Sequence, residues 1–264
     1  MSLTNPTYKV VPLFSGSSGN AAYIRCGDEE YLVDAGVSCK ALQTALNTLD
    51  TDLSRIRAVF VTHEHHDHVK GLETVSKKFG IPVYMYENSY KGIDKPTLRT
   101  ALAPYLHFIS PGDSFACGGM QVNVFKTPHD ACGSVGFRFN FSDGSALGYA
   151  TDIGYITKGI ANALFGCQTV ILESNYDVQM LKTGPYPYYL KQRIESNGGH
   201  LSNDAAAAFV PYLLENGTRK IVLAHLSEEN NTPRLAYDTC VRALAAAGAE
   251  PKEYKITVAM RSIL

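Results

Sequence analysis

The chain has little that would tie it to a membrane or to an oxidising compartment. Its N-terminus, MSLTNPTYK, has no apolar h-region, and no run of about 18 apolar residues occurs anywhere in the chain. The cysteines form no CxxC pair, so they indicate neither a thiolate zinc site nor a disulfide framework. These absences predict a soluble cytoplasmic protein without a membrane partner.

An excess of charge of either sign is also missing. The 264 residues include 24 basic and 25 acidic side chains, for a formal net charge of −1. A protein held on nucleic acid by bulk charge would be basic, which excludes a coat or packaging protein. Local basic groups can still guide one strand into a cleft.

No linker, low-complexity run or acidic tail divides the chain, and its length fits one domain or two fused halves. Apolar spacing predicts strands at Tyr8–Phe14, Ala21–Cys26, Glu30–Val33, Arg57–Thr62, Ile81–Tyr86, Met120–Lys126, Val135–Phe141, Ser145–Thr151, Thr169–Leu172 and Lys220–Ala224. It predicts helices at Cys39–Leu49, from Val69 to Phe79, at Asp204–Leu214 and at Arg234–Ala247. Strands followed by helices, repeated in two halves, predict an α/β sandwich.

The richest segment chemically is THEHHDH, which contains the pattern HxHxDH as His63, His65, Asp67 and His68. Three imidazoles and a carboxylate so close together are costly to pack and rarely useful without a metal. A predicted strand precedes the segment and a predicted helix follows it, a usual place for sites in α/β layers. The alternative is a solvated polar loop.

This motif, one earlier segment and three later segments together resemble the metallo-β-lactamase superfamily. The four segments each follow an apolar run: YLVDAG with Asp34, FKTPHD with His129, GYATDIG with Asp152 and KIVLAHLS with His225. The resemblance implies an αββα metallo-β-lactamase sandwich, a single hydrolase domain over residues 1–264. The 73 residues from Asp152 to His225 leave no room for the β-CASP insertion of multi-domain ribonucleases.

The resemblance also implies two divalent metal ions, Zn, Mn or Fe, because the donors are imidazole and carboxylate groups. Its proposed assignment gives one ion His63, His65 and His129, gives the other Asp67, His68 and His225, and makes Asp152 the bridge. Two such ions share one hydroxide as the expected nucleophile. Asp34 is expected to orient a ligand imidazole from behind. Asp67 and His200 are the predicted catalytic residues, and His66 lies off the ligand pattern.

Closer resemblance lies outside these ligands. The segments 14–20, 173–194, 199–204 and 223–233 resemble the YycJ/WalJ-like subgroup, regarded as bacterial 5′→3′ DNA exonucleases. Tyr176 stands where the subgroup usually has histidine. The resemblance implies a dinuclear-metal phosphodiesterase acting on a single- or double-stranded DNA end.

Several residues outside the ligand set are candidate substrate contacts. His200 precedes a predicted helix, where it is suited to donate a proton or contact phosphate, or merely to cap. The Gly-rich turn from Ser15 to Asn20 is suited to cradle a phosphate or only to shape the floor of the site. The segment from Lys182 to Arg193, in which basic residues alternate with tyrosines, is suited to hold a nucleic-acid strand or only to pack on the sandwich. The contacts predicted in these segments and after His225 are Ser17, Ser18, Asn20, Lys182, Lys191, Arg193, Ser227 and Asn231.

Two other function classes stay open on the sequence. One is a thioester or other small-molecule hydrolase of the glyoxalase II type, or an RNA or nucleotide phosphodiesterase, at the same metal centre. The other is a non-catalytic binding module, against which the complete ligand set argues. The sequence leaves open the metal, the strandedness of the substrate and the oligomeric state.

Overall fold

The computed structural model of the chain describes residues 8–264 and shows two β-sheets packed face to face. The first sheet has the order β1-β2-β3-β4-β5-β6. Its strands are β1 (Tyr8–Phe14), β2 (Ala21–Cys26), β3 (Glu29–Val33), β4 (Ile56–Val61), β5 (Val83–Tyr86) and β6 (Leu106–Ile109). The N-terminal half of the chain thus builds one sheet, antiparallel from β1 to β3 and parallel from β3 to β6.

The second sheet has the order β13-β12-β11-β10-β9-β8-β7. Its strands are β7 (Ser114–Cys117), β8 (Met120–Lys126), β9 (Val135–Phe141), β10 (Ala146–Ala150), β11 (Thr169–Glu173), β12 (Lys220–Ala224) and β13 (Lys255–Val258). Strands β10 to β13 run parallel, so their carboxyl ends meet at one edge of the sheet.

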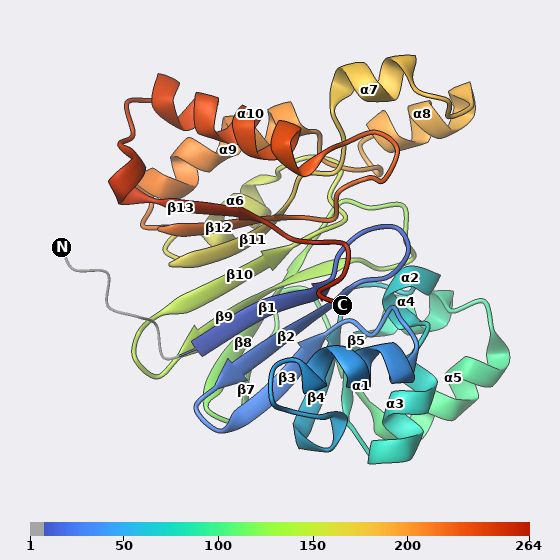
Figure 1. Ribbon diagram of the computed structural model, residues 1–264. Coiled ribbons are helices and arrows are strands. Elements are labelled where there is room, and N and C mark those ends of the chain that lie inside the picture. The colour runs from blue at the N-terminus through green and yellow to red at the C-terminus, as the bar shows by residue number, and fades with distance from the viewer. Residues whose placement is uncertain (1–7) are drawn as a thin grey trace.

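Helices cover the outer face of each sheet (Figure 1). Those of the first half are α1 (Cys39–Asn47), α2 (His66–Val69), α3 (Leu72–Phe79), α4 (Glu87–Gly92) and α5 (Pro96–Leu102), with the 3₁₀ turns η1 (Leu53–Arg55) and η2 (Ala103–Tyr105). Those of the second half are α6 (Lys158–Leu164), α9 (Asn203–Glu215) and α10 (Pro233–Ala246), with η3 (Pro251–Glu253). Two further helices, α7 (Val178–Thr183) and α8 (Tyr188–Glu195), project beyond the sheets (Figure 1).

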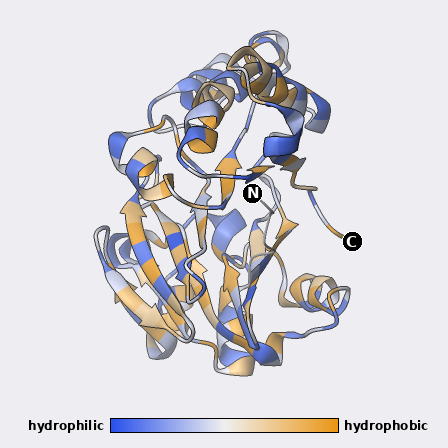
Figure 2. Ribbon diagram, turned by 90° about the vertical axis from the view of Figure 1, so that its left-hand side faces the viewer, coloured by the Kyte–Doolittle hydropathy of each residue, from blue (hydrophilic) through white to orange (hydrophobic). Residues whose placement is uncertain are grey.

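Three apolar cores separate these four layers. The central core joins the two sheets and includes Phe60, which meets the rings of Tyr84, Phe137 and Phe139 with centroids 5.2, 5.7 and 5.3 Å away. The other two cores lie between each sheet and its helices. Figure 2 shows hydrophobic residues along the strands and hydrophilic stretches in the peripheral helices and loops. This arrangement is the predicted αββα sandwich in one domain, and no β-CASP domain interrupts β10 to β12.

The predicted strands are present, with ends that differ by at most two residues, and Ser202 caps α9 by accepting from the Ala205 N–H. The predicted helix start at Val69 is wrong, because α2 begins at His66 inside the ligand motif and Gly71 separates it from α3. The segment 87–119, which periodicity left unassigned, holds two short helices and two strands, and β13 was not predicted. These elements are four to seven residues long, too short for a clear period.

All six cysteines are free thiols. Among residues 8–264, no helix combines the length and apolarity that crossing a bilayer requires.

Candidate metal centre

The candidate site residues lie where strands end, at the edge shared by both sheets. Asp34 follows β3, His63 follows β4, Asp152 follows β10 and His225 follows β12. Asp34, Asp152 and His225 have positive φ angles of 62°, 55° and 57°. Residues other than glycine seldom adopt this conformation, and such strain concentrates at functional sites. The backbone therefore turns sharply after three separate strands and gathers these side chains at one edge of the sandwich.

Gly36 allows the turn after β3 to lie directly against the histidine motif. Its N–H donates to the Asn20 carbonyl at 2.8 Å, and the Asn20 N–H donates to the Asp67 carbonyl at 2.8 Å. A Cβ atom at position 36 would lie 1.6 Å from that Asp67 oxygen and 2.6 Å from the Asn20 nitrogen. Backbone contacts this close exclude every side chain, so glycine here holds the shape of the Asp67–His68 turn.

We expect Gly36→Ala to displace the Asp67–His68 turn and to lower metal content and activity together, because the obstructing atoms are backbone. The matched control is Gly159→Ala in the exposed part of α6, where the nearest atom would be 3.6 Å away. That control should keep metal content and raise the stability of the fold slightly, since alanine favours a helix over glycine. Elemental analysis and thermal unfolding of the two variants measure both effects. Normal metal content in Gly36→Ala would contradict the proposed role of this contact.

Ligand atoms of the motif converge into compact groups. In each group, one candidate ligand atom per residue lies within 4.8 Å of the others. The groups are His63, His65 and His129; His63, His68 and Asp152; Asp67, His68 and His225; and Asp152, Glu173, His200 and His225. The predicted ligand triads are thus brought together, with Asp152 beside both.

Three buried polar atoms in these groups have no hydrogen-bond partner among the described residues: His63 Nε2, His225 Nε2 and Asp152 Oδ2. Buried polar atoms are normally paired, and an orphan at such a place indicates an ion or water. The donors are nitrogen and carboxylate oxygen, which suit borderline divalent cations. The site therefore fits divalent metal ions.

Contacts behind the imidazoles fix which nitrogen faces the site. Asp34 Oδ2 accepts a bond from His68 Nδ1 at 2.8 Å and another from the Thr62 hydroxyl at 2.9 Å. The Gly199 carbonyl accepts from His129 Nδ1 at 3.1 Å. Such partners hold the tautomer that leaves Nε2 for a metal. The orienting role predicted for Asp34 remains a prediction, and its position behind His68 supports it.

Glu173, the last residue of β11, is a site residue that sequence reasoning missed. Its Oε1 accepts bonds from Nδ1 of both His200 and His225, each at 2.8 Å. Its Oε2 accepts from the Ile153 N–H at 2.7 Å and the Leu201 N–H at 3.1 Å. Both oxygens are hydrogen-bonded and the side chain is fully buried, so Glu173 is placed to hold the two imidazoles in position. A carboxylate at the end of an apolar strand was the signal available in the sequence.

The carboxylates make the site electrically attractive to cations. Burial lowers the pKa of His68, but Asp34 and Asp152 outweigh it and raise that pKa to about 10. Burial raises the pKa of Asp152, but the imidazoles of His225 and His68 hold it well below its usual range. Burial and the neighbouring His68 lower the pKa of His63. Since histidine must lose its proton to bind a metal, metal affinity should weaken as pH falls.

A cavity of about 230 Å³ opens onto this cluster. Three predicted substrate contacts, Ser17, Arg193 and Ser227, line it, together with the predicted catalytic residue His200. The remaining lining residues are His65, Asp67, His129, Asp130, Asp152, Asn175, Tyr186, Leu190, Ile194, Gly199 and His225. The structure thus gathers residues from 17 to 227 around one space.

Other predicted contacts lie elsewhere. Ser18 is exposed outside the cavity lining, and the buried Asn20 amide turns toward Asp67 and His68, with Nδ2 3.2 Å from Asp67 Oδ2. The buried Asn231 amide bonds to Asn203 and to the carbonyls of Ser174 and Asn175. Both asparagines are therefore used to shape loops around the site.

The two predicted lysine contacts lie on α7 and α8. The Lys191 ammonium donates to the carbonyls of Lys182 and Gly184, each at 2.8 Å, and so closes the loop between the helices. The Lys182 side chain is exposed and has no hydrogen bond or ion pair within the described part of the chain. Of the two ammonium groups, that of Lys182 is the one available to a phosphate.

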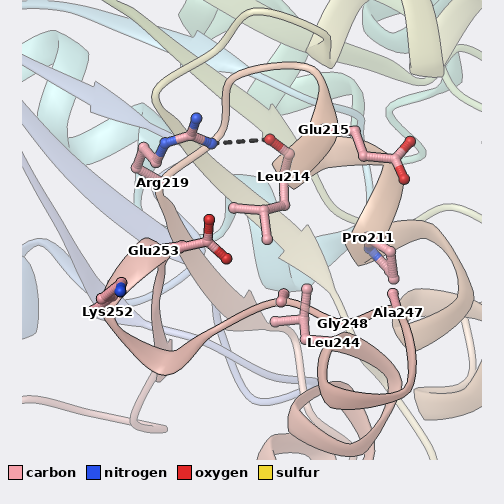
Figure 3. A pocket seen from close by; sticks show the side chains of 10 residues that line it. Pro211, Leu214, Glu215, Arg219, Leu244, Ala247, Gly248, Lys252 and Glu253 are labelled. Carbon is pink, nitrogen blue, oxygen red and sulfur yellow. Dashed lines mark hydrogen bonds between the residues drawn. The ribbon is translucent and has the colours of Figure 1, made fainter. Parts of the chain in front are cut away.

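A larger cavity of about 740 Å³ lies between α9, α10 and η3 (Figure 3). It contains Arg219, whose guanidinium donates to the Leu214 carbonyl at 2.9 Å. Arg219 directly precedes β12, whereas His225 directly follows it. The larger cavity therefore lies at the opposite end of that strand, and its lining includes none of the clustered histidines.

Known proteins resemble this chain in sequence and in architecture. Residues 29–226 match the family model of the beta-lactamase superfamily domain. The exodeoxyribonuclease WalJ of Streptococcus pneumoniae strain D39 is 35% identical over 241 residues, 91% of this chain and 89% of that protein. The exodeoxyribonuclease YycJ of Bacillus anthracis is 34% identical over 224 residues, 85% of this chain and 84% of that protein.

Among solved structures, Zn²⁺-bound PqqB from Methylobacterium extorquens superposes with a TM-score of 0.69 at 18% identity, covering 97% of this chain and 98% of PqqB. That likeness concerns the fold. The family match and the two long alignments confirm the resemblance seen in the sequence. The chain belongs to the metallo-β-lactamase superfamily, in its YycJ/WalJ-like subgroup.

Proposed function

We propose that this protein is a metal-dependent DNA exonuclease that degrades strands in the 5′→3′ direction in the cytoplasm. The observation that carries the proposal is the 34–35% identity, over most of the chain, to two exodeoxyribonucleases. The converging histidine and carboxylate groups support it, since they suit the hydrolysis of a phosphodiester. The free thiols are consistent with a reducing compartment.

Two divalent ions would be held by the residues grouped above. The first would use His63, His65 and His129, and the second Asp67, His68 and His225, with Asp152 between them. When bound, such ions supply a water-derived nucleophile at neutral pH and neutralise charge on the phosphate. The orphaned nitrogens of His63 and His225 support this division.

His200 is our proposed proton donor to the leaving oxygen. Its ring lines the cavity with a side chain 20% exposed, and its Nδ1 donates to Glu173. Since the carboxylate occupies Nδ1, the other ring nitrogen, Nε2, is left for the substrate. Glu173 is thereby a positioning residue for both His200 and His225.

The terminal phosphate would meet hydroxyl groups at the cavity wall. Ser17 and Ser227 line the cavity from opposite ends of the sequence. The Ser227 hydroxyl oxygen accepts from the Asn230 N–H at 3.2 Å, so its own proton is free to be donated. Lys182 and the exposed rings of Tyr188 and Tyr189, each 74% exposed, would contact the strand outside the cavity.

Digestion of end-labelled single-stranded DNA tests this proposal. Protein supplied with Mn, Zn or Fe(II) should release a 5′ label as mononucleotide from the first time points. The same strand with a 3′ label should instead shorten through a ladder of intermediates. Immediate release of the 3′ label would contradict the direction, and faster digestion of a matched RNA would contradict the DNA preference.

A further inference from the structure

Helices α7 and α8 form a hairpin, here called the cap (residues 178–195), that packs largely on itself. Its buried Leu181 and Ile194 meet Tyr176 in a cluster separate from the three cores of the sandwich. The half-buried side chains packed against that cluster are Val178, Tyr186 and Leu190. Figure 1 shows the hairpin projecting beyond the sheets, apart from α9 and α10. Tyr176 thus serves the packing of the cap.

An ion pair holds the cap beside the metal centre. The Arg193 guanidinium donates to both oxygens of Asp130, from Nε at 2.5 Å and from Nη2 at 3.2 Å. Asp130 directly follows the proposed ligand His129, and its N–H donates to the Gly198 carbonyl at 2.8 Å. A two-pronged contact of this kind fixes geometry as well as adding energy. The position of α8 is therefore defined relative to His129.

The two sides of α8 border different spaces. Leu190, Arg193 and Ile194 follow helical spacing and line the catalytic cavity together with Tyr186. A separate hollow of about 270 Å³ is lined by the other side of α8 and by α7, through Leu181, Lys182, Tyr188, Lys191, Gln192 and Glu195. The helix therefore forms a wall between the catalytic cavity and this outer hollow.

The catalytic cavity is small. Its volume of about 230 Å³ lies below the roughly 300–1,000 Å³ typical of pockets for drug-sized ligands. Its cap side presents Tyr186, Leu190 and Ile194, whereas its sheet side presents the ionisable cluster. An apolar, partly aromatic wall suits the flat face of a base, and the cluster suits a phosphate. The space thus matches one nucleotide rather than a strand that continues in both directions.

We propose that the cap makes cleavage depend on a free strand end. The inner side of α8 closes the cavity beyond one terminal nucleotide, so an uninterrupted strand cannot bring an internal phosphodiester to the metal centre. This proposal rests on the DNA hydrolysis proposed above. It assigns the requirement for a free strand end to three residues of the cap, Tyr186, Leu190 and Arg193.

The test compares one single-stranded DNA in linear form and closed into a covalent circle. Wild-type protein should degrade the line and leave the circle intact. The variant Tyr186→Ala/Leu190→Ala should cut the circle. The ratio of the cleavage rate on the circle to that on the linear strand should rise at least about 10-fold, because the side chains that block an uncut strand are removed. An unfolded cap would also open the cavity, so this expectation does not require the variant cap to stay folded.

Arg193→Ala is a second variant in which the cap keeps its apolar cluster and loses the tie to Asp130, and its ratio should also rise. The matched control is Gln192→Ala on the outer side of α8, which should degrade the linear strand like wild type and keep the circle intact. Hydrolysis of bis(p-nitrophenyl) phosphate, a small diester, verifies that each variant retains a working centre.

The outcomes separate the cap from the proposed function. If wild-type protein degrades neither DNA, the proposed nuclease function fails and the cap proposal fails with it. If wild-type protein cuts the circle as fast as the line, the nuclease function stands and the cap proposal is overturned. Active Tyr186→Ala/Leu190→Ala and Arg193→Ala variants that still leave the circle intact would overturn it equally.

Discussion

Replacing Asp152 by alanine is expected to remove most bound metal and nearly all activity. Asp152 Oδ1 lies 3.4 Å from His225 Nδ1 and 3.8 Å from His129 Nε2, and Oδ2 lies 3.5 Å from His68 Nε2. It therefore stands between the two proposed triads, and Oδ2 has no other partner within residues 8–264. Activity should fall by more than the roughly 10–100-fold that losing an outer hydrogen-bond partner costs. Elemental analysis and phosphodiester turnover on the same preparation measure both losses.

His66→Ala is the matched control, because it changes a histidine of the same motif that is exposed and belongs to no ligand group. It should keep metal content and turnover close to wild type. If His66→Ala were as damaging as Asp152→Ala, the wrong histidines of the motif would have been assigned as ligands. Asp152→Asn preserves the shape of the side chain and removes its charge. If this variant binds more metal than Asp152→Ala, the shape of the side chain contributes to metal binding apart from its charge.

His200→Ala should retain metal and slow the cleavage of DNA by about 10²–10⁴, the usual range for a lost acid–base group. A p-nitrophenyl phosphodiester should suffer less, because its leaving group departs without needing a proton. The comparison of kcat on the two substrates measures this difference. Equal losses on both would favour phosphate positioning over proton donation by His200.

Glu173→Gln extends the same experiment to the residue behind His200. The amide presents one oxygen in place of two, so it cannot accept from all four of the donors that now contact the carboxylate. As for His200→Ala, we expect DNA cleavage to slow more than cleavage of the p-nitrophenyl diester. We also expect weaker metal retention, because Glu173 positions His225. An unchanged ratio between the two substrates would show that Glu173 does not act through His200.

The sequence predicted the sandwich because most strands carry continuous apolar runs and the ligands follow them closely. β11 and β12, for example, are bounded by polar residues and read directly as buried strands. It did not predict how close the backbone lies at Gly36, since a contact with Asp67 joins residues 31 positions apart. Short elements such as α4 and β13 were missed because they hold too few residues to show a period.

Within the site, spacing and resemblance identified the side chains that converge, but could not assign the contacts of their neighbours. The sequence presents Asn20, Asn231 and Lys191 as substrate contacts. In the structure the two asparagines lie in loops and Lys191 lies on α8, and hydrogen bonds within the protein occupy all three side chains. Glu173 was missed for the complementary reason. Its single charge closes an otherwise apolar strand, and only the fold brings His200 and His225 to it.

Metal-titrated hydrolysis of DNA by the wild-type protein tests the central claim most directly. Protein stripped with chelator should be inactive, and turnover of a linear strand should rise with added Mn or Zn until about two equivalents per chain are bound, as a two-metal centre requires. S-lactoylglutathione, tested at the same metal loading, should be turned over slowly or not at all. Rapid hydrolysis of that thioester, with no cleavage of DNA at any metal content, would contradict the account.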